Sequence, residues 1–137
     1  KVLFEKMKLD FNEDFNGKPL IETLLTPTNI YVKTFKALRN KIVAMAHITG
    51  GGIVENLPRV LPENLMAEVK EDSIKVLPIF ELMAPHIDRA EMFRAFNMGV
   101  GMILVVEDAN VDAVLAKAEG SYLIGEIKEG KREAIMV

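Results

Sequence analysis

The residues that most clearly suggest a binding site are three consecutive glycines, Gly50 to Gly52. They follow an apolar run from Ile42 to Ala46. Glycine tolerates positive φ and has no Cβ, so such a run lets another group approach the backbone closely. Where a turn of this kind joins a strand to a helix, the first helical N–H groups are unpaired and suit a phosphate. Residues 49–56, TGGGIVEN, match neither the P-loop nor the dinucleotide fingerprint. Anion binding and a tight structural turn therefore both stay open.

A candidate catalytic residue, His47, lies at the end of the apolar run. A side chain at such a strand end faces the ligand in many α/β domains, although a lone histidine is also common as a hydrogen-bonded structural residue. The chain has two histidines and no cysteine, and its acidic residues do not form a paired-carboxylate pattern. The sequence therefore predicts no metal site and no means of holding Mg-ATP on this chain.

A second glycine-bearing element, FNMGVGM, covers residues 96–102. Gly99 and Gly101 are expected at a helix-to-strand junction. The favoured interpretation is structural: Gly99 ends the helix, and Gly101 lets another part of the backbone pack closely.

These motifs have to be positioned by strands and helices that alternate along the chain. Hydrophobic patterns predict five strands, at residues 43–48, 65–70, 100–106, 122–127 and 132–137. Glu129, Gly130 and Lys131 form a link short enough for an antiparallel hairpin. We therefore expect an α+β fold in which a mixed, mostly central β-sheet is covered by helices in layers.

Helix boundaries are predicted from caps and prolines. The segment from Thr26 to Thr28 is expected to start a helix with Tyr31, Phe35, Leu38 and Ile42 on one face, and its lysines and arginine on a solvated face. Asp88 and Asn110 are expected to cap two later helices. Residues 1–8 are predicted to be a short helix, and residues 10–18 a mobile polar loop.

Composition limits the class of protein. The chain has 137 residues, half of them hydrophobic, and a formal charge of -3, which fits one domain and argues against nucleic acid or an anionic membrane as partner. No signal peptide is apparent, and the lack of cysteine favours a cytoplasmic location. Because the chain begins inside a predicted helix, we expect it to be an excised domain.

Three motifs together are characteristic of a family: LLTPTNIYVK (24–33), AHITGGGIVENLPRVLP (46–62) and EMFRAFNMGVGMILVV (91–106). In this order and spacing they resemble the C-terminal domain of the aminoimidazole ribonucleotide synthetases, also called phosphoribosylformylglycinamidine cyclo-ligases. The resemblance spans nearly the whole chain. It departs from the family at Asn29, where a basic residue often follows Pro-Thr, so a phosphate contact at that position is not expected.

The resemblance implies a role in purine synthesis. ATP would activate the amide oxygen of formylglycinamidine ribonucleotide, and an amidine nitrogen would close the imidazole ring to give aminoimidazole ribonucleotide. Residues 1–137 would be one domain, the C-terminal half of a two-domain enzyme, with residues 1–25 as linker and lead-in helices. ATP and Mg²⁺ would be bound mainly by the N-terminal domain, which is absent here, so the isolated fragment is expected to be inactive. The full-length enzyme would be a homodimer.

The same resemblance assigns expected site residues on the wall of an interdomain cleft. Thr49, Gly50, Gly51 and Gly52 would donate to an anionic group of the substrate, with Asn56, Asn97 and the candidate catalytic His47 nearby. The alternative is a non-catalytic folding, dimerisation or ligand-binding module in which the glycines are structural.

Overall fold

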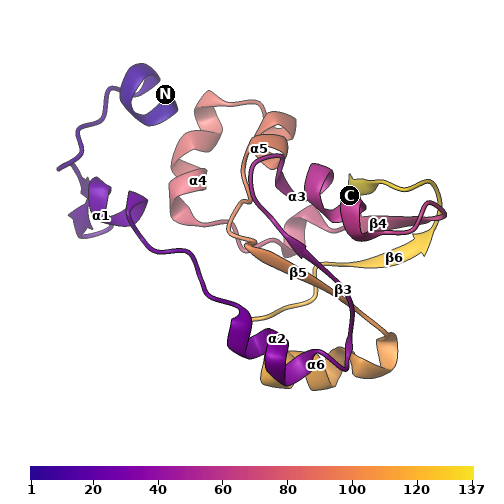
Figure 1. Ribbon diagram of the computed structural model, residues 1–137. Helices are drawn as coiled ribbons and strands as arrows, with labels where there is room; N and C mark the ends of the chain where they lie inside the picture. The colour runs from indigo at the N-terminus through magenta and orange to yellow at the C-terminus, as the bar shows by residue number, and fades with distance from the viewer.

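The computed structural model describes residues 1–137, and short helices surround small sheets in it (Figure 1). The α+β class predicted from the sequence is confirmed. The helices are α1 (Leu20–Leu24), α2 (Val32–Leu38), α3 (Gly52–Asn56), α4 (Pro78–Met83), α5 (Arg89–Ala95) and α6 (Val111–Lys117). A π-helical turn spans Val2–Lys6, and short 3₁₀ helices span Leu57–Val60, Glu71–Ser73, Ala84–His86 and Asp108–Asn110. No helix is both long enough and apolar enough to span a membrane.

The strands form three small sheets rather than one central sheet. They are β1 (Asp14–Phe15) with β2 (Lys18–Pro19), β3 (Ile42–His47) with β5 (Met102–Val106), and β4 (Leu65–Val69) between β6 (Gly125–Glu129) and β7 (Ala134–Met136). All pairs are antiparallel except β4 and β7, which are parallel. The predicted mixed sheet is therefore the three-stranded one.

The predicted C-terminal hairpin is wrong, because β6 and β7 do not pair with each other. Strand β4 lies between them and gains backbone partners on both edges. A close approach at Gly125 makes this possible, since a Cβ there would collide with the Glu68 carbonyl oxygen. The connecting loop also crosses the residues before β4, where the Gly130 N–H donates to the Asn64 carbonyl at 3.0 Å. Loop length alone therefore misidentifies the partner strand.

The main core lies between the β4 sheet, α3, α4 and α5, and one end of the β3–β5 pair. Its least exposed members include Ile48, Ile53 and Leu57, each exposed by 2% or less. At the other end of β3 and β5, α2 and α6 lie side by side, and Leu38 packs there with Val114 and Ala118 (Figure 1). The β3–β5 pair thus joins two separate apolar clusters.

Helix α2 begins later than the proline signal predicts, at Val32 instead of near Thr26 to Thr28. Its apolar face is fully covered only at Leu38, whereas Phe35 remains 40% exposed. Tertiary packing rather than intrinsic propensity stabilises most short helices. The unpacked residues before Val32 therefore stay irregular, although Pro27 could begin a helix.

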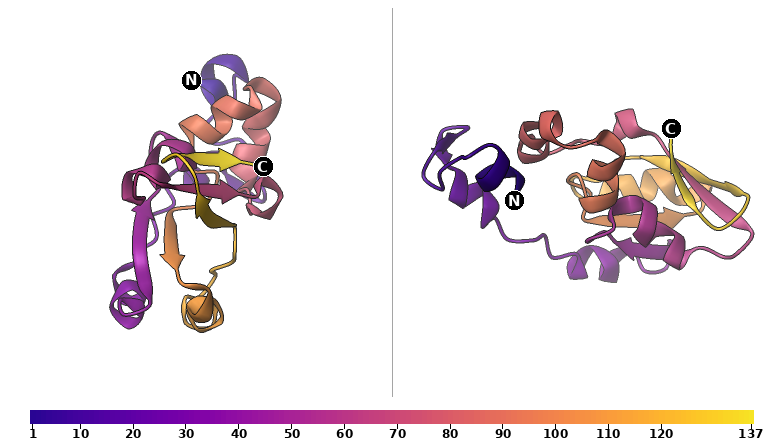
Figure 2. Two further views of the ribbon diagram at one scale, coloured as in Figure 1. Left: turned by 90° about the vertical axis from the view of Figure 1, so that its right-hand side faces the viewer. Right: turned by 90° about the horizontal axis from the view of Figure 1, so that it is seen from above.

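Residues 1–25 stand to one side of the fold, and residues 26–31 connect them to α2 (Figure 2). The π-helical turn nevertheless packs on the main core, where Leu3 is buried. The predicted loop over residues 10–18 is instead a small hairpin. Asn16 and Gly17 both have positive φ, at 56° and 83°, which is the geometry of a tight two-residue hairpin turn.

Of the two caps predicted for the later helices, one is confirmed. The Asp88 carboxylate accepts from the N–H groups of Ala90 at 3.0 Å and Glu91 at 3.4 Å, at the start of α5. Asn110 precedes α6 but makes no side-chain cap bond. Its Oδ1 accepts instead from the Lys41 ammonium at 3.0 Å, because that charged donor competes with the helix N–H groups.

On the outer edge of the β4 sheet, the Lys128 ammonium bonds the carboxylates of Glu68 at 2.7 Å and Glu126 at 3.0 Å. Both hydrogen bonds raise the pKa of Lys128, and the bond to Glu68 has the larger effect. A raised folded-state pKa adds stability below the unfolded value, near 10.4, and that stability is lost as pH rises through the folded value.

We therefore expect Lys128→Met to lower the thermal unfolding midpoint slightly at pH 8 and to have a smaller effect near pH 11. The pair is exposed, so salt should weaken the difference. Thermal melts of both proteins at the two pH values check this. A difference that grows above pH 10 would contradict it.

Candidate functional site

The glycine turn connects β3 to α3. Ile48 continues the ladder beyond β3, since its N–H donates to the Gly101 carbonyl at 3.0 Å. Gly51 and Gly52 then adopt left-handed φ values of 97° and 58°. Gly50 has no positive φ and open space around it. The turn therefore requires glycine at two of its three glycine positions.

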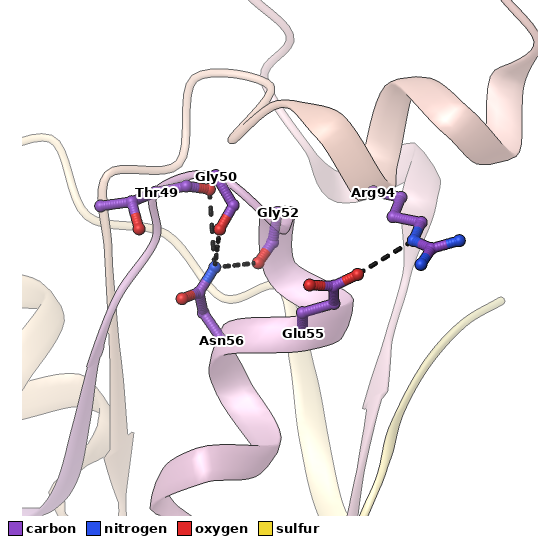
Figure 3. A network of polar contacts seen from close by, with 6 residues as sticks. All are labelled: Thr49, Gly50, Gly52, Glu55, Asn56 and Arg94. Atoms are coloured by element: carbon purple, nitrogen blue, oxygen red, sulfur yellow. Dashed lines mark hydrogen bonds and ion pairs between the residues drawn. The ribbon is translucent and has the colours of Figure 1, made fainter.

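Asn56 closes this turn from inside (Figure 3). Its side chain is buried, and the amide nitrogen donates to the carbonyls of Gly52 at 2.7 Å, Gly50 at 3.2 Å and Thr49 at 3.5 Å. The residue belongs to α3, so the first helical turn holds the loop that precedes it. Asn56 was predicted to contact substrate, but its amide nitrogen is occupied by the loop.

The fold brings the two glycine motifs together. A Cβ on Gly52 would collide with the carbonyl oxygen of Phe93 and lie 2.9 Å from that of Phe96. The end of α5 and the turn after it therefore lie directly against the loop. In that turn, Asn97 accepts from the Gly99 N–H at 3.0 Å through its Oδ1. Gly52 and Asn97, predicted from separate motifs, thus lie on segments that pack against each other.

Three backbone N–H groups of the loop have no acceptor within the protein. They belong to Thr49, Gly50 and Gly51, and none of them appears in a backbone or side-chain hydrogen bond. Thr49 and Gly50 are exposed, and Gly51 is partly exposed. The expected benefit of a helix dipole is small, because α3 has only five residues. Any anion at this site would be bound mainly by the loop N–H groups.

A polar groove lies beside the loop between α3 and α5. It has a volume of about 490 Å³ and is lined by Gly51, Glu55, Ala90, Glu91, Arg94 and Ala95. Across it the Arg94 Nε donates to a Glu55 carboxylate oxygen at 2.9 Å (Figure 3). Neither charged residue is among the site residues predicted from the sequence. Glu55 lies in α3, so its nearness to Gly51 follows from the sequence. The approach of α5 does not follow from it.

His47 ends β3 with an exposed side chain, opposite Met102 in the ladder. It makes no hydrogen bond or ion pair with another side chain. No group of three or more histidine, aspartate and glutamate side chains is arranged to hold a metal ion. His47 is therefore accessible to a ligand, with no neighbouring acid to orient it.

A second cavity lies elsewhere, along β5. It has a volume of about 580 Å³, is mostly apolar, and separates β5 from β4, β6 and α6. Gly99 and Gly101 reach its wall, but Thr49 to Gly52 do not. Tyr31 also lines it, with its hydroxyl where a Cβ on Gly101 would lie. The predicted close approach at Gly101 is therefore made by a side chain.

Comparison with known proteins decides the family. A family model described as "AIR synthase related protein, C-terminal domain" matches residues 1–137. The chain belongs to this family. The resemblance carried by the three sequence motifs is confirmed, and the α+β fold agrees with it.

Relatives of this AIR synthase related domain have a common name. Proteins named phosphoribosylformylglycinamidine cyclo-ligase from Thermoanaerobacter sp. (strain X514), Brevibacillus brevis and Burkholderia lata are 43%, 45% and 40% identical to it. The matches cover 99%, 94% and 100% of the chain. They cover 43%, 40% and 42% of the relatives. The chain thus spans less than half the length of these proteins.

Proposed function

We propose that residues 1–137 are the substrate-side domain of an ATP-dependent cyclo-ligase. The longer enzyme would convert formylglycinamidine ribonucleotide to aminoimidazole ribonucleotide in de novo purine biosynthesis, in the cytoplasm. The observation that carries the proposal is the match of the entire chain to the AIR synthase related family, with relatives of that enzyme name at 40% to 45% identity.

In this proposal the glycine loop binds an anionic group of the ribonucleotide. Its support is geometric: the N–H groups of Thr49, Gly50 and Gly51 are free, and Asn97 and His47 lie at the ends of the elements that meet there. Backbone N–H groups that converge in a turn bind phosphate and carboxylate oxygens well. Gly52 would contribute mainly by letting α5 approach.

Mg²⁺ does not fit this chain's own donor set. Mg²⁺ needs carboxylate oxygens together with phosphate, and no cluster of three acidic or histidine side chains is present. We propose that a preceding N-terminal domain binds ATP and Mg²⁺, with residues 1–25 as the lead-in to this domain, and that the full-length enzyme is a homodimer. The isolated chain would then be inactive.

We propose that this domain contributes mainly substrate binding to the reaction, with His47 as its candidate catalytic residue. ATP would phosphorylate the amide oxygen of the substrate and release ADP, the amidine nitrogen would attack the activated carbon and lose a proton, and inorganic phosphate would leave with that oxygen. The loop would hold the ribonucleotide in the geometry needed for ring closure.

Replacing Gly51 with alanine in the full-length protein tests the site. The new Cβ would lie 2.8 Å from a Glu55 carboxylate oxygen at a φ of 97°. We expect KM for the ribonucleotide to rise about 10-fold, because a misplaced binding group costs one to two orders of magnitude. Steady-state kinetics with each substrate varied in turn gives the measurement.

Gly120→Ala is the matched control. Gly120 also has a positive φ, 73°, with no atom near its added Cβ, so it carries the backbone strain without touching the loop. It should leave KM unchanged. If Gly51→Ala leaves both KM and kcat unchanged, the assignment of the loop is wrong. If the unaltered full-length protein does not form aminoimidazole ribonucleotide, the proposed reaction is wrong.

A further inference from the structure

We infer that Asn56 is the positioning residue of the glycine loop, which turns the N–H groups of Gly50 and Gly51 toward a bound anion. The inference rests on the proposed function and adds the residue that shapes its site. Asn56 is the only buried polar residue of the chain, 5% exposed. A polar side chain in such a place is retained only where its hydrogen bonds are satisfied.

The orientation of the Asn56 amide follows from its partners. Its three contacts in the loop are the backbone carbonyls of Thr49, Gly50 and Gly52. All three are acceptors, so the group facing them must be the NH₂ and not the carbonyl oxygen. Asn56 therefore acts on the loop only as a donor.

Planar peptide geometry converts these contacts into a direction for the N–H groups. No peptide bond in the chain is cis, and in a trans peptide the C=O and the following N–H point in opposite directions. Drawing the Thr49 carbonyl toward Asn56 therefore turns the Gly50 N–H away from it. The Gly50 carbonyl sets the Gly51 N–H in the same way. Both N–H groups lack a protein acceptor, as this orientation requires.

Such an arrangement is preorganised for a ligand. Without these hydrogen bonds, binding would have to order the loop, and the conformational entropy lost by its glycines would weaken the affinity for the ligand. The hydrogen bonds of Asn56 fix one backbone conformation of the loop during folding, before any ligand binds. Its loss should therefore weaken binding of the anionic substrate without changing the group that reacts.

Asn56→Asp in the full-length protein tests this. The side chain keeps its shape, but an ionised carboxylate cannot donate to the three carbonyls. We expect KM for the ribonucleotide to rise about 10-fold to 100-fold, with KM for ATP unchanged. A merely structural role would instead reduce the amount of folded enzyme, which lowers apparent kcat and leaves both KM values as they are.

Lower pH should partly rescue the variant. A protonated carboxyl regains one donor, so the KM ratio between variant and native enzyme should fall as pH is lowered from 8 toward 6. Asn110→Asp is the control for the same chemical change, because the Asn110 Oδ1 accepts from Lys41 and a carboxylate still does so. An unchanged ribonucleotide KM in Asn56→Asp would overturn the inference.

A second measurement separates this inference from the proposed function. Inorganic phosphate is titrated into the native and Asn56→Asp proteins, and the amide resonances of Gly50 and Gly51 are followed by NMR. Saturable shifts in the native protein that are lost in the variant support the positioning role, even if the full-length protein forms no aminoimidazole ribonucleotide. Equal responses in the two proteins, or none in either, overturn it.

Discussion

Replacing Gly52 with alanine is expected to lower the free energy of unfolding by about 3 kcal/mol or more. Two costs add at this position. Its φ of 58° disfavours any residue with a Cβ, by about 1–2 kcal/mol. The Cβ would also collide with the Phe93 carbonyl oxygen, and forcing atoms into a packed interior costs about 1–3 kcal/mol. Because the obstacle is backbone of α5, no side-chain rotation relieves it.

Two other glycines separate these costs. Gly120 has a positive φ of 73° in open space, so its alanine variant should lose about 1 kcal/mol from backbone strain alone. Gly50 has neither problem, so Gly50→Ala should be neutral or stabilise slightly through the unfolded chain. Urea unfolding of the three variants gives the order. Equal losses for Gly52→Ala and Gly120→Ala would show that the contact with α5 contributes nothing.

Elements that carry their own burial pattern were predictable from the sequence. The apolar run before the glycines, predicted as a strand at residues 43–48, is β3 (Ile42–His47). Asp88 caps α5 because its signal is local, requiring only the next two or three residues. In each case the information lies within one or two turns of the element.

Errors occurred where the outcome depends on distant partners. The link at Gly130 is compatible with a hairpin between β6 and β7. Instead, β4 lies between these strands and pairs with one of them on each edge. Asn110 could cap α6, but Lys41 reaches its oxygen from the turn between α2 and β3. Such competitions are decided by tertiary contacts, which a local pattern does not contain.

The hairpin between β1 and β2 was not predicted, although its turn has a clear sequence signal. Asn16-Gly17 is the strongest short-range signal for a two-residue hairpin, and the structure has that hairpin between β1 and β2. The polar composition of residues 10–18 outweighed it in the prediction. A specific turn signal therefore predicts local structure better than polar composition does.

The sequence names the candidate site residues but does not give their arrangement. The family motifs named Gly50 to Gly52, Asn56 and Asn97, and the structure brings their elements together. Sequence alone does not tell whether an asparagine offers its nitrogen or its oxygen. Here Asn56 donates to the loop and Asn97 accepts from Gly99. Asn56 therefore needs its side-chain nitrogen and Asn97 its side-chain oxygen. Replacement by aspartate removes the nitrogen but keeps an oxygen, so it distinguishes the two residues.

Asn56→Asp is expected to lower the free energy of unfolding at pH 7 by about 3 kcal/mol. The carboxylate removes the donor from three carbonyls, two of them within 3.2 Å, and places a buried negative charge against their oxygens. Asn97→Asp should stay within about 0.5 kcal/mol of the native protein, since a carboxylate accepts from the Gly99 N–H equally well. Urea unfolding of both variants measures the difference.

The pH dependence of that loss gives its cause. Burial and the facing carbonyl oxygens should raise the pKa of the introduced carboxyl in the folded state above its unfolded value, about 3.9. A group with a raised folded pKa is most stabilising below the unfolded value and loses that contribution as pH rises through the folded one. The deficit relative to the native protein should therefore shrink as pH falls from 7 toward 4, where the protonated carboxyl donates to one carbonyl again. A deficit that is constant over this range would mean that Asn56 stabilises the loop by shape alone and not by donating to it.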